Sequence, residues 1–150
     1  MILSGELRSY IIPNRAHARF LLRDFLQYRR MKHKIFVYGT LKRGGSNHGL
    51  LAKQNFISAA RTQPHYRLYS LGNFPAMVEA LQDGRSIEGE IWGVDAACLL
   101  ELDQLEEVDQ GVYKRVPIPL LPPHDNLVLE GYVHLKSITG LRDCGEFWPV

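Results

Sequence analysis

Cysteine is scarce in this chain, and its scarcity argues against two kinds of site. The 150 residues contain two cysteines, Cys98 and Cys144, which stand far apart and form no C-x-x-C pair. Such thiols indicate neither a zinc site nor a disulfide framework, so a reduced, cytoplasmic setting is expected. The six histidines are scattered, without the spacing of metal ligands. The sequence therefore predicts no metal site.

Long hydrophobic runs and a strong net charge are also lacking. No run approaches the ~18 consecutive apolar residues that a membrane-spanning helix requires. The formal net charge of +2 is too small to argue for a nucleic-acid surface, so no nucleic-acid partner is expected. The content of 45% hydrophobic and 23% charged residues is typical of a soluble globular protein. A chain of this length predicts one domain with a sizeable core.

The beginning of the chain differs from the rest in its charge. Six arginines stand against two acidic residues within residues 1–30. Over residues 15–30, apolar and basic side chains would occupy different faces of a helix, as in segments that contact membranes or partners and in transit peptides. We favour plainer interpretations of this segment: a helix packed on the domain, an extension without function, or translation that starts at Met31. We therefore divide the chain into a basic amphipathic extension, residues 1–33, and a domain, residues 34–150.

The domain begins with a strand that leads into a glycine-rich loop. Residues 35–38 are apolar and favour β-structure, and the run breaks at Gly39. Loops of this kind aim several backbone N–H groups at one point, which is how proteins hold carboxylates and phosphates. The loop is not a P-loop, because Gly45 stands where a phosphate-neutralising lysine is required. Two interpretations stay open: a clamp for a small anion near residues 39–41, and a plain glycine turn.

The rest of the chain predicts more strands than helices. A proline-containing segment, residues 112–121, is expected at a sheet edge because proline cannot donate to the strand ladder. Asp95 is a good N-cap for a helix that runs from residue 96 to about residue 106 or 107. We expect a short helix at 47–55 and extended structure at 59–71, 76–78, 87–94 and 127–135. The pattern favours an α+β domain built on a curled sheet or small barrel.

A carboxylate lies on the apolar face of the predicted second helix. At 100° per residue, Leu99, Leu102 and Glu106 fall within about a sixth of a turn of one another. A carboxylate there is costly unless it is paired, protonated or used, and desolvation would raise its pKa toward neutrality, as a general base requires. If the helix ends earlier, Glu106 is simply solvated, which is the more frequent case for an arbitrary glutamate.

Two further candidate features carry less weight. Tyr113 follows the turn after this helix, where its hydroxyl could reach back to the helix end, although a tyrosine at the start of a strand more often serves packing. Ser46, His48 and Asp109 could be imagined as a hydrolase triad, but the chain has no G-x-S-x-G elbow to support it.

Taken together, these segments resemble the γ-glutamylcyclotransferase-like family. This family includes γ-glutamylcyclotransferases, γ-glutamylamine cyclotransferases and AIG2-like proteins. The resemblance covers about residues 34–135 and follows the family's order and spacing. It rests on Tyr38-Gly-Thr-Leu-Lys-Arg-Gly44 with Asn47-His48, on Glu88-Gly-Glu90-Ile-Trp, on Leu102-Asp-Gln-Leu-Glu106 and on Tyr113-Lys-Arg. It implies an α+β fold, a small mixed β-barrel with flanking helices.

The resemblance also implies a role for particular residues. The loop Tyr38-Gly39-Thr40-Leu41 would hold the α-carboxylate of a γ-glutamyl group, Glu106 would be the acid/base, and Tyr113 would line the pocket. An aromatic residue of the last strand often lines the site in this family, and here Tyr132 and His134 compete for that place. For Glu90, which matches a family glutamate, we expect a structural role.

The implied chemistry is an intramolecular acyl transfer without a cofactor. In a small γ-glutamyl substrate, the α-amine attacks the γ-carbonyl, closes 5-oxoproline and releases the amine or amino acid on the other side. The base must remove a proton, because an α-amino group with a pKa of about 7.7–8 is mostly protonated at neutral pH. The alternative is a non-catalytic module of the same fold that binds a small carboxylate, or a partner through the amphipathic extension.

Overall fold

Strands make up most of the regular structure in residues 33–150. The computed structural model describes residues 15, 19, 22, 23, 26 and 33–150. The predicted extension of residues 1–33, with its amphipathic pattern at 15–30, therefore lies almost wholly outside the described residues. The elements are β1 (His33–Val37), the 3-10 helix η1 (His48–Leu51), β2 (Asn55–Arg61), β3 (Tyr66–Ser70), β4 (Pro75–Glu79), β5 (Glu88–Val94), α2 (Ala96–Leu105), the 3-10 helix η2 (Val108–Gln110), β6 (Tyr113–Pro117), β7 (Glu130–His134) and β8 (Arg142–Gly145).

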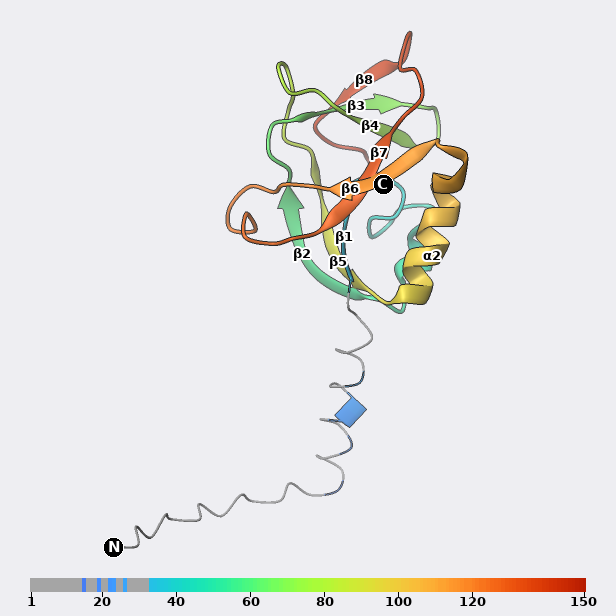
Figure 1. Ribbon diagram of the computed structural model, residues 1–150, viewed down its shortest axis with the longest axis vertical. Helices are drawn as coiled ribbons and strands as arrows, with labels where there is room; N and C mark the ends of the chain where they lie inside the picture. Colours follow the sequence, from blue (N-terminus) through green and yellow to red (C-terminus); the bar gives the residue numbers. More distant parts are fainter. Residues whose placement is uncertain (1–14, 16–18, 20–21, 24–25, 27–32) are drawn as a thin grey trace, which may run out of the picture.

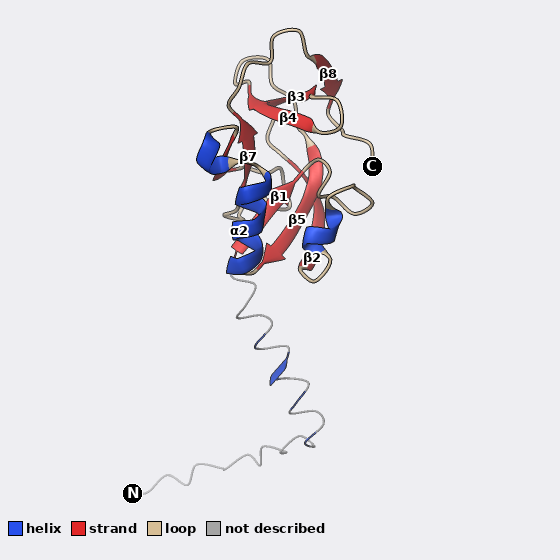
Figure 2. Cartoon of the chain, turned by 90° about the vertical axis from the view of Figure 1, so that its right-hand side faces the viewer, coloured by secondary structure: helices blue, strands red, loops and turns tan. Residues whose placement is uncertain are grey.

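The strands form two sheets, with α2 beside the larger one (Figures 1 and 2). The five-stranded sheet has the order β2-β5-β1-β7-β6, and the three-stranded sheet has the order β4-β3-β8. In the larger sheet, β1 is antiparallel to β5 and parallel to β7. The predicted α+β class is confirmed.

The central strand β1 is buried on both faces over residues 35–37, the part whose apolar sequence predicts a strand. Ile35 and Val37 pack in a cluster with the apolar face of α2. Phe36, on the opposite face, packs in a second cluster with residues of the three-stranded sheet such as Leu68 and Met77. Because side chains alternate along a strand, the residues that directly follow β1 lie between the two clusters.

Several predicted elements match the structure closely. Strand β6, which covers Tyr113–Pro117 of the predicted 112–121, is at the edge of its sheet, as the prolines of that segment predicted. Helix α2 begins at Ala96, and the side chain of Asp95 caps it by accepting a hydrogen bond from the backbone N–H of Cys98 at 2.8 Å. Of the short helix predicted for residues 47–55, only the 3-10 helix η1 at His48–Leu51 is present, and Asn55 already begins β2.

Other predictions need correction. The continuous extended segment expected at 59–71 is two strands, β2 and β3, which belong to different sheets. Strand β7 covers only Glu130–His134 of the predicted 127–135, and it is not the last strand, because β8 follows it. Strand β8 pairs with the distant β3, so its pairing partner could not be inferred from neighbouring residues.

The C-terminal segment holds the far end of the glycine-rich loop. Trp148 is buried in the core, and its backbone carbonyl accepts a 2.6 Å hydrogen bond from Nζ of Lys42. The same ammonium group lies 4.1 Å from the centre of the Phe147 ring. Burial lowers the pKa of Lys42, and Glu90 and Glu88 oppose that shift. Because Lys42 directly follows the 39–41 loop, this contact restrains the loop from outside.

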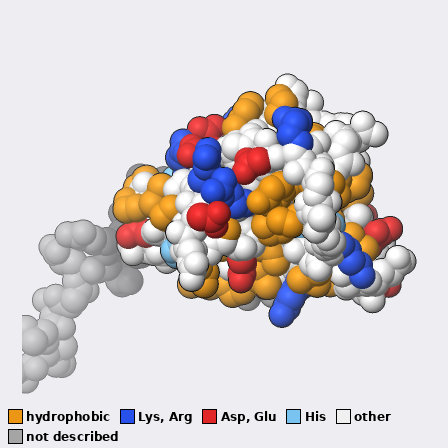
Figure 3. All heavy atoms as spheres, turned by 90° about the horizontal axis from the view of Figure 1, so that it is seen from above, with side chains coloured by type: hydrophobic (Ala, Val, Ile, Leu, Met, Phe, Trp, Pro, Cys, Tyr) orange, Lys and Arg blue, Asp and Glu red, His pale blue; other side chains and the backbone are white. Residues whose placement is uncertain are grey.

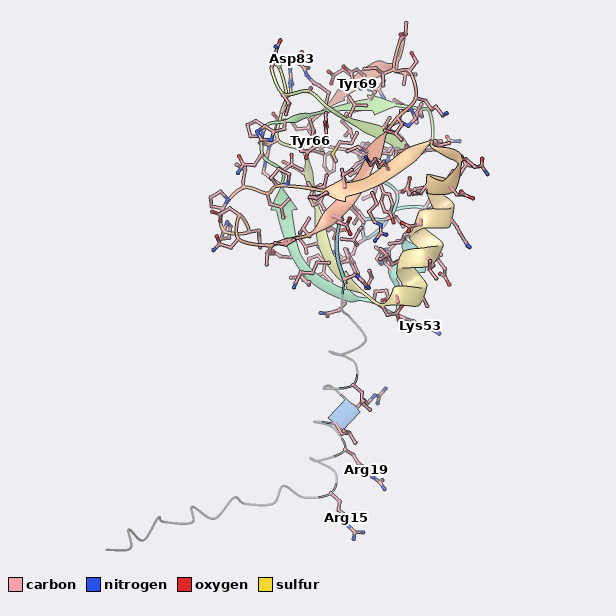
Figure 4. The ribbon with its side chains drawn as sticks, in the orientation of Figure 1. Arg15, Arg19, Lys53, Tyr66, Tyr69 and Asp83 are labelled. Atoms are coloured by element: carbon pink, nitrogen blue, oxygen red, sulfur yellow. The ribbon has the colours of Figure 1, made fainter. Side chains whose placement is uncertain are left out.

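Charges of both signs are intermingled on the face seen from above in Figure 3. On the three-stranded sheet, Arg67 bridges Asp83 at 3.2 Å and Asp143 at 2.9 Å. Asp83 lies at an outer turn, whereas Tyr66 points into the core below this sheet (Figure 4).

Among the described residues, no helix is long and apolar enough to cross a membrane.

Candidate active site

A pocket of about 320 Å³ opens where β1 ends and the glycine-rich loop begins. Its volume is in the range of sites that bind small molecules. It is lined by Phe36, Val37, Tyr38, Gly39, Thr40, Leu41, Asn47, Phe74, Pro75, Leu105, Glu106, Glu107, Val112, Tyr113 and Tyr132. The structure therefore brings all the predicted site residues to one cavity, from the end of β1, the end of α2 and the start of β6.

The loop after β1 is shaped by hydrogen bonds that leave its first N–H groups free. The N–H of Lys42 donates to the carbonyl of Gly39 at 3.1 Å. Asn47 closes the loop twice, with its backbone N–H on the Thr40 carbonyl and its side-chain Nδ2 on Thr40 Oγ1, both at 3.0 Å. The backbone N–H groups of residues 39–41 have no hydrogen-bond acceptor among residues 33–150. Such free donors on a pocket wall can hold an anion.

Gly39 is required by a close approach to the start of β4. A Cβ atom at this position would lie 2.7 Å from Cγ and 2.8 Å from Cδ of Pro75, inside van der Waals contact. Pro75 also lines the pocket and its ring has little freedom to move. The contact therefore sets how closely the loop approaches the opposite wall.

We expect Gly39→Ala to destabilise the fold by about 1–3 kcal/mol, because the added methyl group overpacks this contact. Urea denaturation of the purified variants measures the effect. Gly49→Ala is the matched control, because a Cβ at Gly49 would meet nothing within 4 Å. Equal unfolding free energies for the two variants would contradict the expectation.

Glu106 occupies the C-cap of α2, and its side chain lines the pocket. The helix ends at Leu105, and the N–H of Glu106 still donates to the Leu102 carbonyl at 3.0 Å, so the residue keeps the orientation of the last turn. Glu107 then adopts a left-handed conformation with φ of 51°. The helix is thus marginally shorter than predicted, yet Glu106 is not a freely solvated residue.

The carboxylate of Glu106 is half-buried and has no hydrogen-bond or ion-pair partner within the described part of the chain. Burial raises its pKa from 4.5 to about 7. An unpaired carboxylate with such a pKa exchanges a proton readily near neutral pH, which suits a general acid/base.

Two tyrosines near the carboxylate are held by hydrogen bonds to backbone carbonyls. The hydroxyl of Tyr38 donates to the carbonyl of Tyr132 at 2.7 Å, and that of Tyr113 donates to the carbonyl of Pro75 at 2.9 Å. The Tyr113 hydroxyl therefore contacts the start of β4 and not the end of α2, which was one of the two interpretations of this residue. Burial, followed by the charge of Glu106, raises the pKa of both phenols. They are neutral, rigid parts of the wall.

Of the two candidates in β7, Tyr132 lines the pocket and His134 does not. The Tyr132 hydroxyl donates to Asp103 Oδ1 at 2.7 Å. His134 is buried and packs edge-on against the Tyr113 ring, with ring centroids 4.9 Å apart. His134 thus supports a wall residue from behind.

The remaining candidates lie elsewhere. None of Ser46, His48 and Asp109 lines the pocket, and Nδ1 of His48 is 2.9 Å from the carbonyl of Leu41. Glu90 accepts a 2.7 Å hydrogen bond from the N–H of Arg43 and forms an ion pair with that guanidinium, which agrees with a structural role. Over residues 33–150, no group of three or more histidine, cysteine or acidic side chains is arranged to hold a metal ion.

Sequence reasoning missed part of the pocket wall. Phe74 and Pro75, which the sequence predicts only as part of a turn, line the pocket, as do Leu105, Glu107 and Val112, which were given no role in the site. One signal was available: Phe74 is a large apolar side chain in a predicted turn. The sequence could not show that this turn faces the end of α2.

The family model described as gamma-glutamyl cyclotransferase, AIG2-like, matches residues 35–144. A Vibrio cholerae protein provisionally named a gamma-glutamylcyclotransferase is 45% identical over 78 residues, which are 52% of this chain and 65% of that protein. The human gamma-glutamylaminecyclotransferase is 42% identical over 79 residues, 48% of this chain and 52% of the human protein. The matched part thus spans about half to two thirds of these relatives.

A solved structure agrees with this likeness. The AIG2-like protein of Mus musculus superimposes with a TM-score of 0.56 at 27% sequence identity, over 70% of this chain and 77% of the mouse chain. The family model covers well over half of the chain and includes the loop, the carboxylate and the tyrosines of the pocket. The chain therefore belongs to the gamma-glutamyl cyclotransferase, AIG2-like family.

Proposed function

We propose that this protein is an enzyme that converts a γ-glutamyl amine or γ-glutamyl amino acid into 5-oxoproline and the free amine. One observation carries the proposal: an unpaired, half-buried carboxylate, Glu106, shares a pocket with the free N–H groups of residues 39–41. The first feature suits proton transfer, and the second suits a carboxylate that must be held. No step requires a cofactor.

In this proposal, the 39–41 loop binds the α-carboxylate of the substrate. Its N–H groups supply hydrogen-bond donors without a formal charge, and Asn47 braces the loop through Thr40. Because nucleophile and electrophile belong to one molecule, the site mainly has to hold a conformation in which the amine approaches the γ-carbonyl. The hydrogen-bonded tyrosines form rigid walls for that conformation.

Glu106 then moves two protons in turn from the attacking nitrogen to the leaving nitrogen. As a carboxylate, it takes the first proton from the substrate ammonium, and the freed amine attacks the γ-carbonyl. Glu106 gives this proton to the leaving nitrogen as the bond between that nitrogen and the γ-carbon breaks. The carboxylate then takes the second proton from the ring nitrogen and passes it to the released amine, so the products are 5-oxoproline and an ammonium ion, and Glu106 is again ionised. Nearby N–H groups can steady the developing oxyanion.

The direct test is to incubate the protein with a panel of γ-glutamyl amines and γ-glutamyl amino acids and to measure 5-oxoproline. Formation of 5-oxoproline with at least one substrate is expected. If a γ-glutamyl compound binds and no substrate is turned over, the enzyme proposal is wrong and the chain is a binding module.

The pH dependence gives a second expectation. Glu106 must be ionised in the free enzyme, and burial raises its pKa to about 7. The kcat/KM for 5-oxoproline formation should therefore rise about tenfold per pH unit below pH 7 and level off above it. Initial rates between pH 5 and pH 8 measure this, and a profile that is already level from pH 5 would exclude such a base.

A further inference from the structure

The residues that line the pocket differ sharply in exposure. The inner wall is nearly inaccessible, with Phe36, Leu41 and Tyr132 each at most 4% exposed. In contrast, Phe74 is 45% exposed and Leu105 is 38% exposed, although both line the same pocket. Together with the exposed Glu107, these two residues form what we call the mouth. Large apolar side chains exposed at the rim of a cavity are typical of a ligand contact.

The pocket also has a marked charge pattern. Among the residues that the structure describes, its lining contains no lysine, arginine or histidine, and the carboxylic acids are Glu106 and Glu107. The free N–H groups of residues 39–41 can hold one carboxylate. A second carboxylate on the substrate would find no basic side chain in the lining and would share the mouth with Glu107. Placing a second negative charge next to Glu107, with no basic side chain in the lining to pair with it, is unfavourable.

The bound position of the γ-glutamyl group determines where its other half must go. If its α-carboxylate is on the 39–41 loop and its γ-carbonyl is near Glu106, the inner wall is filled by the glutamyl part. The leaving group then extends toward the mouth, where Leu105 directly precedes Glu106 in the chain. Phe74 directly precedes Pro75, the residue against which Gly39 packs.

We propose that the mouth is a leaving-group subsite for an uncharged apolar amine, aliphatic or aromatic, and that Phe74 and Leu105 are its specificity-determining residues. This inference rests on the proposed function and narrows the substrate class. It favours γ-glutamyl derivatives of apolar amines over those of amino acids, because an amino acid carries its carboxylate next to the scissile amide.

Two matched substrates test the charge preference. γ-Glutamyl-phenethylamine and γ-glutamyl-phenylalanine differ only in the carboxylate of the leaving group. We expect kcat/KM to be at least about tenfold higher for the amine. Equal values, or a preference for the phenylalanine compound, would overturn the proposal.

Side-chain truncation tests the assigned residues. Phe74→Ala and Leu105→Ala should each lower the ratio of kcat/KM for γ-glutamyl-phenethylamine over γ-glutamyl-methylamine by about tenfold, because part of the apolar contact is lost. Leu81→Ala is the matched control, since Leu81 is 74% exposed and does not line the pocket. If both variants have a wild-type circular dichroism spectrum and neither changes this ratio, Phe74 and Leu105 are not part of the subsite.

A charged amine is the competing occupant, because Glu107 is also at the mouth. γ-Glutamyl-1,4-diaminobutane carries an ammonium group that γ-glutamyl-butylamine lacks. A clear preference for the diamine compound would assign the mouth to a cationic leaving group and overturn the apolar assignment.

Binding separates failure of this inference from failure of the proposed function. The affinity of Glu106→Gln for γ-glutamyl-phenethylamine and for γ-glutamyl-phenylalanine can be measured by calorimetry without turnover. If wild type forms no 5-oxoproline but the variant binds the amine compound at least tenfold more tightly, the subsite stands and the enzyme proposal fails. If turnover occurs and the two affinities are equal, the subsite fails and the enzyme proposal stands.

Discussion

Replacing Glu106 with glutamine is expected to lower kcat for 5-oxoproline formation by about 100- to 10,000-fold, the usual contribution of general acid–base catalysis. The amide is close in size to the carboxylic acid but cannot accept the proton of the substrate ammonium. Glu106 has no hydrogen-bond partner among residues 33–150, so the substitution breaks no interaction within that region. The loss should therefore appear in kcat, with the fold intact.

The measurement is the initial rate of 5-oxoproline formation at saturating substrate, together with a circular dichroism spectrum. Glu101→Gln is the matched control, because Glu101 is exposed on the same helix and does not line the pocket. We expect the control to keep wild-type activity. A Glu106→Gln variant within tenfold of wild type would show that another group transfers the proton.

The second large effect is on stability and is independent of turnover. Ionising Glu106 costs more in the folded protein than in the unfolded chain, since burial raises its pKa from 4.5 to about 7. The folded state therefore binds more protons than the unfolded state between these values, and this residue's contribution to stability is lost as the pH rises through that interval. The shift corresponds to at most about 3 kcal/mol between pH 4.5 and pH 8.

Glu106→Gln should remove this dependence. At pH 5 the folded wild type carries a largely neutral Glu106, so the two proteins should have similar unfolding free energies. At pH 8 the variant should be more stable, by up to about 3 kcal/mol, because it has no charge to bury. Urea denaturation at the two pH values measures the difference in unfolding free energy between wild type and Glu106→Gln, with Glu101→Gln in parallel. Other titrating groups such as His134 are present in all three proteins, so their effects cancel in this difference.

A difference between wild type and variant that does not change from pH 5 to pH 8 would contradict a raised pKa at this position. The expected pattern, a variant that is more stable and far less active, is that of a residue kept for chemistry at a cost in stability.

Much of the local structure was predictable from neighbouring residues. The apolar run at residues 35–38 predicted a buried strand, Asp95 predicted the start of α2, and the prolines within residues 112–121 predicted an edge strand. Helical periodicity placed Glu106 on the apolar side of α2, although the helix itself ends one residue earlier. Each of these features depends on interactions within a few residues.

The opposite walls of the pocket were not predictable in the same way. Pro75 packs against Gly39 and accepts a hydrogen bond from Tyr113, and these three residues come from widely separated parts of the chain. The choice of Tyr132 over His134, and the contact of Lys42 with the Trp148 carbonyl, likewise depend on packing between distant segments.

The sequence by itself determined the buried strand, the glycine-rich loop after it, the capped helix and the family motifs that point to Glu106. Only the tertiary structure decided that the loop and the carboxylate share one pocket, and that Phe74 and Leu105 form its mouth. The physical reason is that backbone propensity and side-chain periodicity act over a few neighbouring residues. Which segments then face each other depends on the order of strands in the sheet, which places β1 between β5 and β7.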